Sequence, residues 1–306
     1  MKIAVFGVGG VGGFVGGALA KVHPDTFFYV RGKNLEAIRQ NGLRVCSPLL
    51  GDFVAHPRLA TDQAQEIGVM DVIILACKGC HLEEACRAIR PMVGAHTIVL
   101  TLLNGVLVTD LIAPLLPPCI PVDGVIRVSS RLAEPGQILH ENASCSMTFG
   151  LKDGGTLARL DELSHLLGCA GIQAGVSSHI QLDCWSKYAS MSSNSVVYLY
   201  YDGPAGTVRQ HAGYQTVLRE VIASLIRIAE ATGTKLPDTL AEQYLAAFEQ
   251  LPPETTTSLY RDLKSGKPPE HTELHHIIGR IAAWGRETGV PVPYHQAVCD
   301  QYAAST

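Results

Sequence analysis

The sequence predicts an α/β fold, with a doubly wound parallel sheet in its first half and an all-helical domain in its second. Up to about residue 177, short apolar runs alternate with helical stretches, as in a parallel sheet that is covered on both faces. Beyond that point, apolar residues recur at helical spacing and no further strand pattern of note occurs. We therefore expect two domains, residues 1–177 and residues 178–306.

The elements expected in the first domain follow in order from these runs. Strands are expected at 3–6, 27–30, 72–76 and 97–102, and helices run to about 22 and over 35–41 and 82–89, with a short one after 104–105. Gly42 is placed to end the second helix. A β-rich part at 122–131 and 147–149 is expected to extend the sheet. In the second domain, helices are expected at about 182–201, 216–232, 240–251 and 272–288, punctuated by glycine and proline.

Composition limits the class of protein. The 306 residues are 47% hydrophobic and 17% charged, and the net charge of −4 gives no reason to expect a nucleic acid or a membrane as partner. Nine cysteines, an odd number, occur without an export signal, so we expect reduced thiols in a cytoplasmic protein. The glycine-rich start argues against a signal peptide or a membrane span. A small-molecule partner is expected, and a homodimer is left open.

The first predicted strand runs directly into a G-x-G-x-x-G loop, Gly7-Val8-Gly9-Gly10-Val11-Gly12. Gly7 would allow a tight turn, Gly9 would let a pyrophosphate approach the backbone, and Gly12 would let the next helix pack closely on the strand. The N–H groups at the start of that helix would then face the phosphates. This pattern, between a strand and a helix, predicts a Rossmann-type dinucleotide site.

The end of the second strand distinguishes the two nicotinamide cofactors. NAD sites carry Asp or Glu there for the ribose 2′-OH, whereas NADP sites carry an Arg nearby for the 2′-phosphate. Here the strand ends at Arg31, and no carboxylate follows until Glu36. A guanidinium can hold a phosphate in bidentate fashion, so we expect NADPH as the cofactor.

Two local patterns suggest other chemistry. Cys77 and Cys80 belong to a C-x-x-C-H run with His81, which is typical of c-type haem attachment and contains the C-x-x-C of redox dithiols. No export signal and no second C-x-x-C accompany it, so incidental cysteines are favoured and a redox role for the pair is left open. His271 and His275 are four residues apart, but without a third ligand they predict no metal site.

The ordered set of motifs resembles the ketopantoate reductase (2-dehydropantoate 2-reductase) family over nearly the whole chain. Besides the glycine loop, the motifs that carry this resemblance are Val30-Arg31-Gly32, Lys78, Asn104-Gly105, Pro135-Gly136 with His140, Asp183-Cys184-Trp185-Ser186-Lys187, Ser258-Leu259-Tyr260-Arg261-Asp262, Thr272-Glu273-Leu274 with Gly279, and Gly289-Val290-Pro291-Val292-Pro293. The resemblance implies reduction of ketopantoate to pantoate by NADPH, in pantothenate biosynthesis.

The resemblance also implies roles for individual residues. The lysine of the family's W-x-K motif is the catalytic acid and maps onto Lys187, whose ammonium could stabilise charge on a carbonyl oxygen and donate the proton. Lys78 and Asn104 would contact the nicotinamide ribose and the substrate or lysine. Glu273 would help to hold the cofactor and position the lysine, although one count of the spacing points to Glu270 instead.

The substrate side departs from the family. Ser258 maps onto a ligand of the substrate carboxylate, with a helix cap as an equal interpretation. In the family, asparagines four and eight residues after the lysine bind ketopantoate, and they lie on the same helix face as the lysine. Met191 and Ser195 occupy these two positions here. Asn194, seven residues after Lys187, lies close to that helix face but at a position that is not equivalent. An unpaired polar group on the substrate would cost about 1–3 kcal/mol. A divergent ketopantoate reductase and a reductase of another 2-keto acid or ketone therefore both remain. A related opine or glycerol-3-phosphate dehydrogenase and a non-catalytic NADP sensor are the rival interpretations.

Overall fold

The computed structural model of the chain describes residues 1–303 and divides them into two compact units. Unit 1 comprises residues 1–103 and 107–181, and unit 2 comprises residues 104–106 together with the chain from Leu182 onward. The α/β fold followed by a helical part agrees with the prediction. The short 104–106 segment is the exception to a simple division, because it lies in the first half of the sequence and belongs to unit 2.

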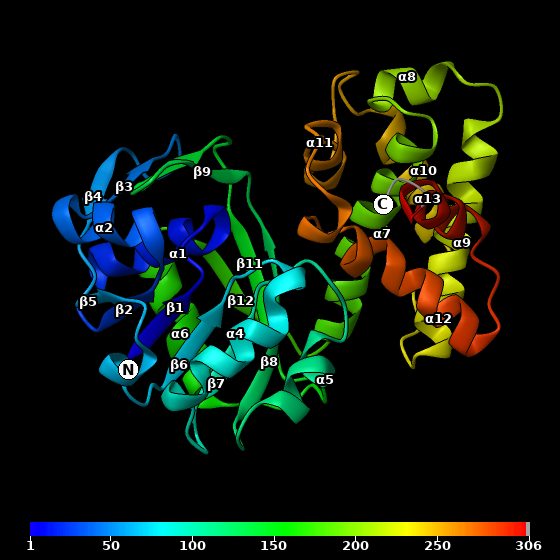
Figure 1. Cartoon of the computed structure of the whole chain (residues 1–306). Helices are drawn as coiled ribbons and strands as arrows, with labels where there is room; N and C mark the ends of the chain where they lie inside the picture. The colour runs from blue at the N-terminus through cyan, green and yellow to red at the C-terminus, as the bar shows by residue number, and fades with distance from the viewer. Residues whose placement is uncertain (304–306) are drawn as a thin grey trace. The chain divides into compact units, whose positions relative to one another are not determined.

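An eight-stranded sheet forms the centre of unit 1 (Figure 1). Its strands, from one edge to the other, are β12 (Gln173–Val176), β11 (Ser146–Gly150), β8 (Ile120–Arg127), β7 (Ile98–Thr101), β6 (Val72–Leu75), β1 (Ile3–Phe6), β2 (Thr26–Tyr29) and β5 (Leu59–Thr61). The six strands from β8 to β5 are parallel, and β11 pairs with β8 in the antiparallel sense. The strand order reverses on either side of β1, which is the point where doubly wound sheets bind ligands.

Helices cover both faces of this sheet. Ile3 and Val5 of β1 face a core that includes residues of α1 (Gly10–Val22) and α6 (Ala158–Cys169). Ala4 and Phe6 face a second core with residues of α4 (Leu82–Ile89) and α5 (Val108–Ile112), because successive side chains of a strand point to opposite faces. The remaining helical segments of unit 1 are α2 (Gly32–Asn41), α3 (Ala64–Ile67), and the 3₁₀ turns Gly79–His81, Arg90–Met92 and Ala113–Leu115.

A second, four-stranded sheet corrects part of the sequence prediction. Its order is β4 (Phe53–Ala55), β3 (Leu43–Cys46), β10 (Gln137–His140) and β9 (Ser130–Glu134). The β-rich part was expected to extend the main sheet, and β8 and β11 do so, whereas β9 belongs to this second sheet. Glycines of α1 explain the close packing beneath it: a Cβ on Gly10 would lie 2.3 Å from the Ser130 carbonyl oxygen, and one on Gly13 2.4 Å from Ile138.

The regular elements among the described residues of unit 2 are all helices or helical turns. It comprises α7 (Ile180–Tyr200, from Leu182 onward), α8 (Ala205–Gln210), α9 (Tyr214–Ala231), α10 (Leu240–Glu249), α11 (Ser258–Lys264), the 3₁₀ turn Pro269–His271, the π-helix His275–Gly279, α12 (Arg280–Thr288) and α13 (Pro293–Ala303). The predicted helix at 272–288 is therefore a π-helical turn that continues into α12. Leu218, Ile222 and Leu225 of α9 are buried at helical spacing. Residues of α7 and α10 pack with Leu218 and Ile222 in one hydrophobic cluster.

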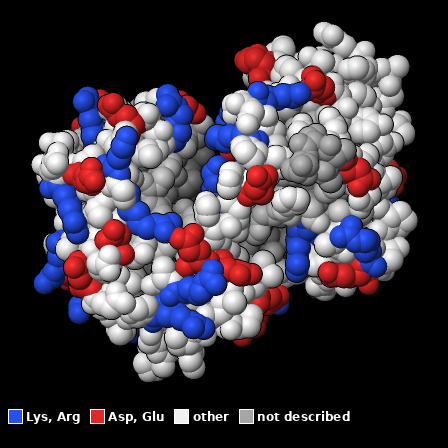
Figure 2. All heavy atoms as spheres, in the orientation of Figure 1, with Lys and Arg blue, Asp and Glu red and all other residues white. Residues whose placement is uncertain are grey.

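On the visible face, the charged side chains form no large patch of a single sign (Figure 2). Lys and Arg alternate with Asp and Glu over the face drawn in Figure 2. No helix among residues 1–303 is long and apolar enough to cross a membrane.

Candidate active site

The glycine loop has the geometry that its pattern predicts. Gly7 has φ +89°, a left-handed conformation that favours glycine, where the chain turns off β1. A Cβ on Gly12 would lie 2.1 Å from the Gly7 carbonyl oxygen, so only glycine allows the start of α1 to pack this closely on the loop. A Cβ on Gly9 would meet nothing within 4 Å, and the backbone there is open to a ligand.

A pocket of about 290 Å³ lies at the carboxyl ends of β1, β2 and β6, where doubly wound sheets bind their ligands. Glycine-loop residues, the end of β2 and one side of α4 form its wall. The lining residues are Phe6, Gly7, Val8, Gly9, Tyr29, Val30, Arg31, Asn34, Ala76, Cys77, Lys78, His81, Glu84 and Ala85. Predicted cofactor residues from three separate strand ends thus meet here, and the open backbone beside basic side chains fits a dinucleotide phosphate.

Asn34 is a pocket residue that sequence reasoning missed. Its side-chain amide donates to the Val8 carbonyl oxygen at 2.8 Å, and its Oδ1 accepts from the Gly136 N–H at 2.7 Å. The side chain therefore ties the glycine loop to the turn between β9 and β10. In the sequence, Asn34 is marked only by its place three residues after Arg31. An asparagine at such a position is too common to be recognised as part of a binding pocket.

A chain of hydrogen bonds in unit 2 joins three of the predicted residues. Lys187 Nζ donates to Asn104 Oδ1 at 2.9 Å, and Asn104 Nδ2 donates to Glu273 Oε2 at 3.2 Å. Glu273 is only 9% exposed, whereas Lys187 and Asn104 are partly exposed. Glu270, the alternative glutamate, lies exposed in the 3₁₀ turn before it. A partly exposed ammonium on an oriented amide is an arrangement that can act on a carbonyl oxygen.

The packing of α7 determines which way Lys187 points. Trp185 is fully buried and its ring meets those of Tyr188 and Trp284 at centroid distances of 5.8 Å. Residues two apart on a helix point in nearly opposite directions, so burial of Trp185 turns Lys187 away from that core. The Tyr188 hydroxyl donates to the Ile277 carbonyl oxygen at 2.5 Å and so joins α7 to the π-helix. One turn of π-helix beside a polar cluster is a common feature of functional sites.

His276 is a second residue that sequence reasoning missed. Its imidazole forms a hydrogen bond with the backbone of Asn104, and its Nε2 is buried without a hydrogen-bond partner among the described residues. Burial lowers the pKa of the imidazole, and the nearby Arg280 charge lowers it further. A neutral imidazole therefore holds the backbone of Asn104 through this hydrogen bond. The sequence offered only two adjacent histidines, which could equally have been on the surface.

The predicted substrate residues are not brought together in one place. Met191 is partly exposed one turn after Lys187. Ser195 is fully buried and its hydroxyl donates to Thr257 Oγ1 at 3.0 Å. Asn194 lines a separate cavity of about 50 Å³ with Ser190 and Ser193. Ser258 is exposed at the first position of α11, and the N-cap is Thr257 rather than Ser258, since the Thr257 side chain accepts from the Tyr260 N–H.

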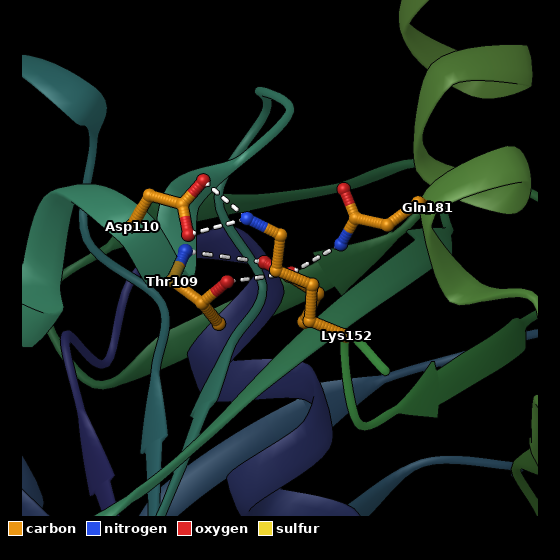
Figure 3. Close-up of polar contacts among 5 residues, drawn as sticks. Thr109, Asp110, Lys152 and Gln181 are labelled. Atoms are coloured by element: carbon orange, nitrogen blue, oxygen red, sulfur yellow. Dashed lines mark hydrogen bonds and ion pairs between the residues drawn. The ribbon is translucent and has the colours of Figure 1, made fainter. Parts of the chain in front are cut away.

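A buried carboxylate anchors the first turn of α7 within unit 1. Asp123 of β8 accepts hydrogen bonds from the Thr109 N–H at 3.2 Å, the Thr109 hydroxyl at 2.7 Å and Gln181 Nε2 at 2.7 Å (Figure 3). Burial raises the pKa of the Asp123 carboxyl, and these hydrogen bonds oppose the rise. Lys152 and Asp110 form an ion pair beside the network at 2.6 Å. The start of the helix that later carries Lys187 is thus bonded to the central sheet.

The remaining local patterns gather no ligand set. Cys77 lines the pocket and Cys80 is exposed in the next 3₁₀ turn, both as thiols. His271 and His275 are both exposed. Within residues 1–303, no group of three His, Cys, Asp or Glu side chains is placed to hold a metal ion.

Both parts of the chain match sequence models of one enzyme family. The model described as "Ketopantoate reductase PanE/ApbA" matches residues 3–154, and its companion "Ketopantoate reductase PanE/ApbA C terminal" matches residues 179–305. The chain belongs to the ketopantoate reductase family. Members are oxidoreductases that act on a C=O or CH–OH group, and NADPH is the family's reductant.

Individual relatives of this ketopantoate reductase family member are distant, but those compared below match 91% or more of the chain. The 2-dehydropantoate 2-reductase of Mesorhizobium japonicum is 28% identical over 97% of this chain and 95% of its own. "Uncharacterized oxidoreductase YkpB" of Bacillus subtilis is 26% identical over 91% of both chains. A crystal structure of a PanE/ApbA family ketopantoate reductase from Ralstonia eutropha has a TM-score of 0.88 at 25% identity, and covers 99% of this chain and 98% of that one. The resemblance expected from the motifs is therefore confirmed.

Proposed function

We propose that this protein reduces a 2-oxo acid to a 2-hydroxy acid with NADPH, and that 2-dehydropantoate is the substrate. The observation that carries the proposal is the chain Lys187–Asn104–Glu273, because it assembles the predicted acid and its positioning groups from distant parts of the sequence. Family membership and the relatives named 2-dehydropantoate 2-reductase support the substrate.

The cofactor would bind at the pocket of unit 1. The open backbone at Gly9 and the N–H groups at the start of α1 would take the pyrophosphate. Arg31 would hold the 2′-phosphate, and Lys78, which lines the same pocket, would lie along the ribose. When bound, NADPH supplies the hydride for the keto carbon.

Unit 2 would supply the proton. As the carbonyl carbon accepts a hydride, its π electrons move to oxygen, and the Lys187 ammonium donates a proton to that oxygen. Asn104 Oδ1 holds the Lys187 ammonium in place, and Glu273 fixes the orientation of the Asn104 amide, because its carboxylate can only accept from Nδ2. The product is a 2-hydroxy acid.

A second candidate, a reductase of another 2-keto acid, is favoured by the helix face that carries Lys187. Met191 presents a thioether where the family has an asparagine, and Ser195 is turned into the interior toward Thr257. A thioether accepts hydrogen bonds only weakly, so it would suit an apolar substituent better than the hydroxyl of 2-dehydropantoate.

The test is NADPH oxidation with 2-dehydropantoate beside a panel of 2-keto acids that differ only in the side chain, from methyl to phenyl. The highest kcat/KM with 2-dehydropantoate would support the first candidate, and a preference for an apolar side chain would support the second. NADPH binding without turnover on any member would contradict both, and would favour a non-catalytic sensor.

A further inference from the structure

Arg31 has an acidic neighbour that is 53 residues away in the sequence. Glu84 of α4 reaches the guanidinium at the end of β2, and Arg31 Nη1 lies 2.5 Å from Glu84 Oε1. Both side chains line the dinucleotide pocket, and they are 55% and 48% exposed. The arginine that is predicted to select NADPH through its positive charge is thus paired with a carboxylate.

Few other charges act on this pair. Glu84 also lies 3.9 Å from His81 Nδ1 and within electrostatic range of Arg87, while Arg31 is within range of Asp62 and Tyr29. The hydrogen bond from Arg31 is the main cause that lowers the pKa of the Glu84 carboxyl. Glu84 is therefore ionised at neutral pH in the free protein.

The two nicotinamide cofactors differ in what they would meet at this pair. A 2′-phosphate carries about −1.5 to −2 charges at neutral pH, and a bidentate phosphate would compete with Glu84 for the donor at Arg31 Nη1. Whether or not the carboxylate gives up this donor, the phosphate would lie close to its negative charge. A ribose 2′-hydroxyl brings no charge and can donate a hydrogen bond to a carboxylate, as it does in NAD sites.

We infer that Glu84 is a specificity-determining residue that reduces the preference for NADPH over NADH which Arg31 alone would produce. The inference rests on the proposed role of Arg31 as the phosphate ligand. Glu84 acts as a competing anion in the free protein and as a repelling charge in the NADPH complex. Exposed ion pairs contribute little to folding stability, so the carboxylate can be changed without unfolding the chain.

The test compares Glu84→Gln with Glu83→Gln. Glu83 precedes Glu84 on the same helix, is exposed and does not line the pocket, so its replacement changes the net charge equally without touching Arg31. The dissociation constants of NADPH and NADH are measured for both variants by fluorescence titration at low and at high salt, without any substrate.

We expect Glu84→Gln to tighten NADPH binding by about threefold to tenfold and to leave NADH binding unchanged or weaker, since one nearby unit charge is removed. The gain should shrink as salt rises, because exposed charges are screened. Glu83→Gln should change both constants by less than about twofold. An unaltered NADPH-to-NADH ratio in Glu84→Gln, or an equal shift in Glu83→Gln, would overturn the inference.

Measuring Arg31→Gln and the double variant Arg31→Gln/Glu84→Gln in the same way separates the inference about Glu84 from the proposal that Arg31 binds the 2′-phosphate. If Arg31→Gln weakens both cofactors equally, Arg31 does not bind the phosphate, and the role of Glu84 falls with it. If Arg31→Gln weakens NADPH selectively but Glu84→Gln does not alter the ratio, only the Glu84 inference fails. Agreement requires that the selective effect of Glu84→Gln is smaller once Arg31 is absent, because the competition for the guanidinium is then gone and only the repulsion by the carboxylate remains. Failure to reduce any 2-oxo acid would leave these binding results intact.

Discussion

The polar groups of unit 1 and of unit 2 lie in different surroundings. Arg31 and Glu84 at the dinucleotide pocket are each about half exposed, so water and salt screen their interaction. The hydrogen-bonded series in unit 2 ends on Glu273, which is 9% exposed. His276, which hydrogen-bonds to the backbone of Asn104, has a buried ring nitrogen without a partner among the described residues. A polar contact at the exposed pocket of unit 1 adjusts binding affinity. A polar contact among the buried groups of unit 2 costs more free energy when it is lost, because a buried polar group is then left without a partner. The comparison predicts salt-dependent effects on cofactor binding in unit 1 and effects on turnover in unit 2.

The largest effect is expected at Lys187. Lys187→Ala removes the proton donor, and a general acid typically contributes about 10²- to 10⁴-fold to rate. We expect kcat on the 2-oxo acid to fall by this factor, while the NADPH dissociation constant stays within about twofold, since the pocket residues belong to unit 1. Steady-state kinetics and fluorescence titration measure the two. Turnover close to that of the unmodified enzyme would remove Lys187 from the mechanism.

At the pocket, Arg31→Gln should weaken NADPH binding by about 10- to 100-fold, which corresponds to losing charge-assisted hydrogen bonds to a phosphate. NADH binding should change by less than about threefold. Lys33→Gln is the matched control, because Lys33 is exposed two residues further on and does not line the pocket. If the two variants behave alike, the effect is one of general charge and the pocket assignment is wrong.

Asn104→Ala tests whether the link between Lys187 and Glu273 matters. It removes both hydrogen bonds of the side chain and leaves a nearly buried carboxylate without this donor, so kcat should fall about tenfold. A positioning role also predicts that the pH profile of kcat moves, which a purely structural loss would not cause. A lower melting temperature with an unchanged profile would instead show that Asn104 only supports the fold.

The smallest effect concerns stability rather than catalysis. Burial lowers the pKa of His295 in α13 to about 3, and the ordinary value in the unfolded chain is about 6.5. The unfolded state therefore binds a proton below pH 6.5 that the folded state rejects. This contribution to stability is present above 6.5 and is lost as the pH falls toward 3, at about 1.4 kcal/mol per pH unit.

His295→Leu should accordingly reduce the loss of unfolding free energy between pH 6.5 and 4, measured by urea unfolding at each pH. His96→Leu, at an exposed histidine of unit 1, should leave that slope unchanged. Parallel slopes for His295→Leu and the unmodified protein would show that the imidazole is not held neutral in the interior.

Local patterns accounted for much of unit 1. The glycine loop, the end of β2 at Arg31 and the start of α4 follow from spacing within a few residues, where the conformational limits of glycine and the alternation of strand side chains apply directly. The second sheet was missed because β3 and β10 are short, have mixed exposure and pair across about 90 residues. The extra glycines of α1 were visible in the sequence, but only this second sheet explains why Gly10 and Gly13 are needed there.

The sequence by itself determined the family, the α/β and helical halves, and the residues expected at the cofactor loop and at Lys187. These depend on short-range spacing and on motif order, both of which one chain displays directly. Only the tertiary structure decided that Asn104 belongs with the helical unit, that Glu273 rather than Glu270 meets it, and that Glu84 stands against Arg31. Such pairs are separated by 53 to 169 residues, and packing rather than local periodicity brings them into contact.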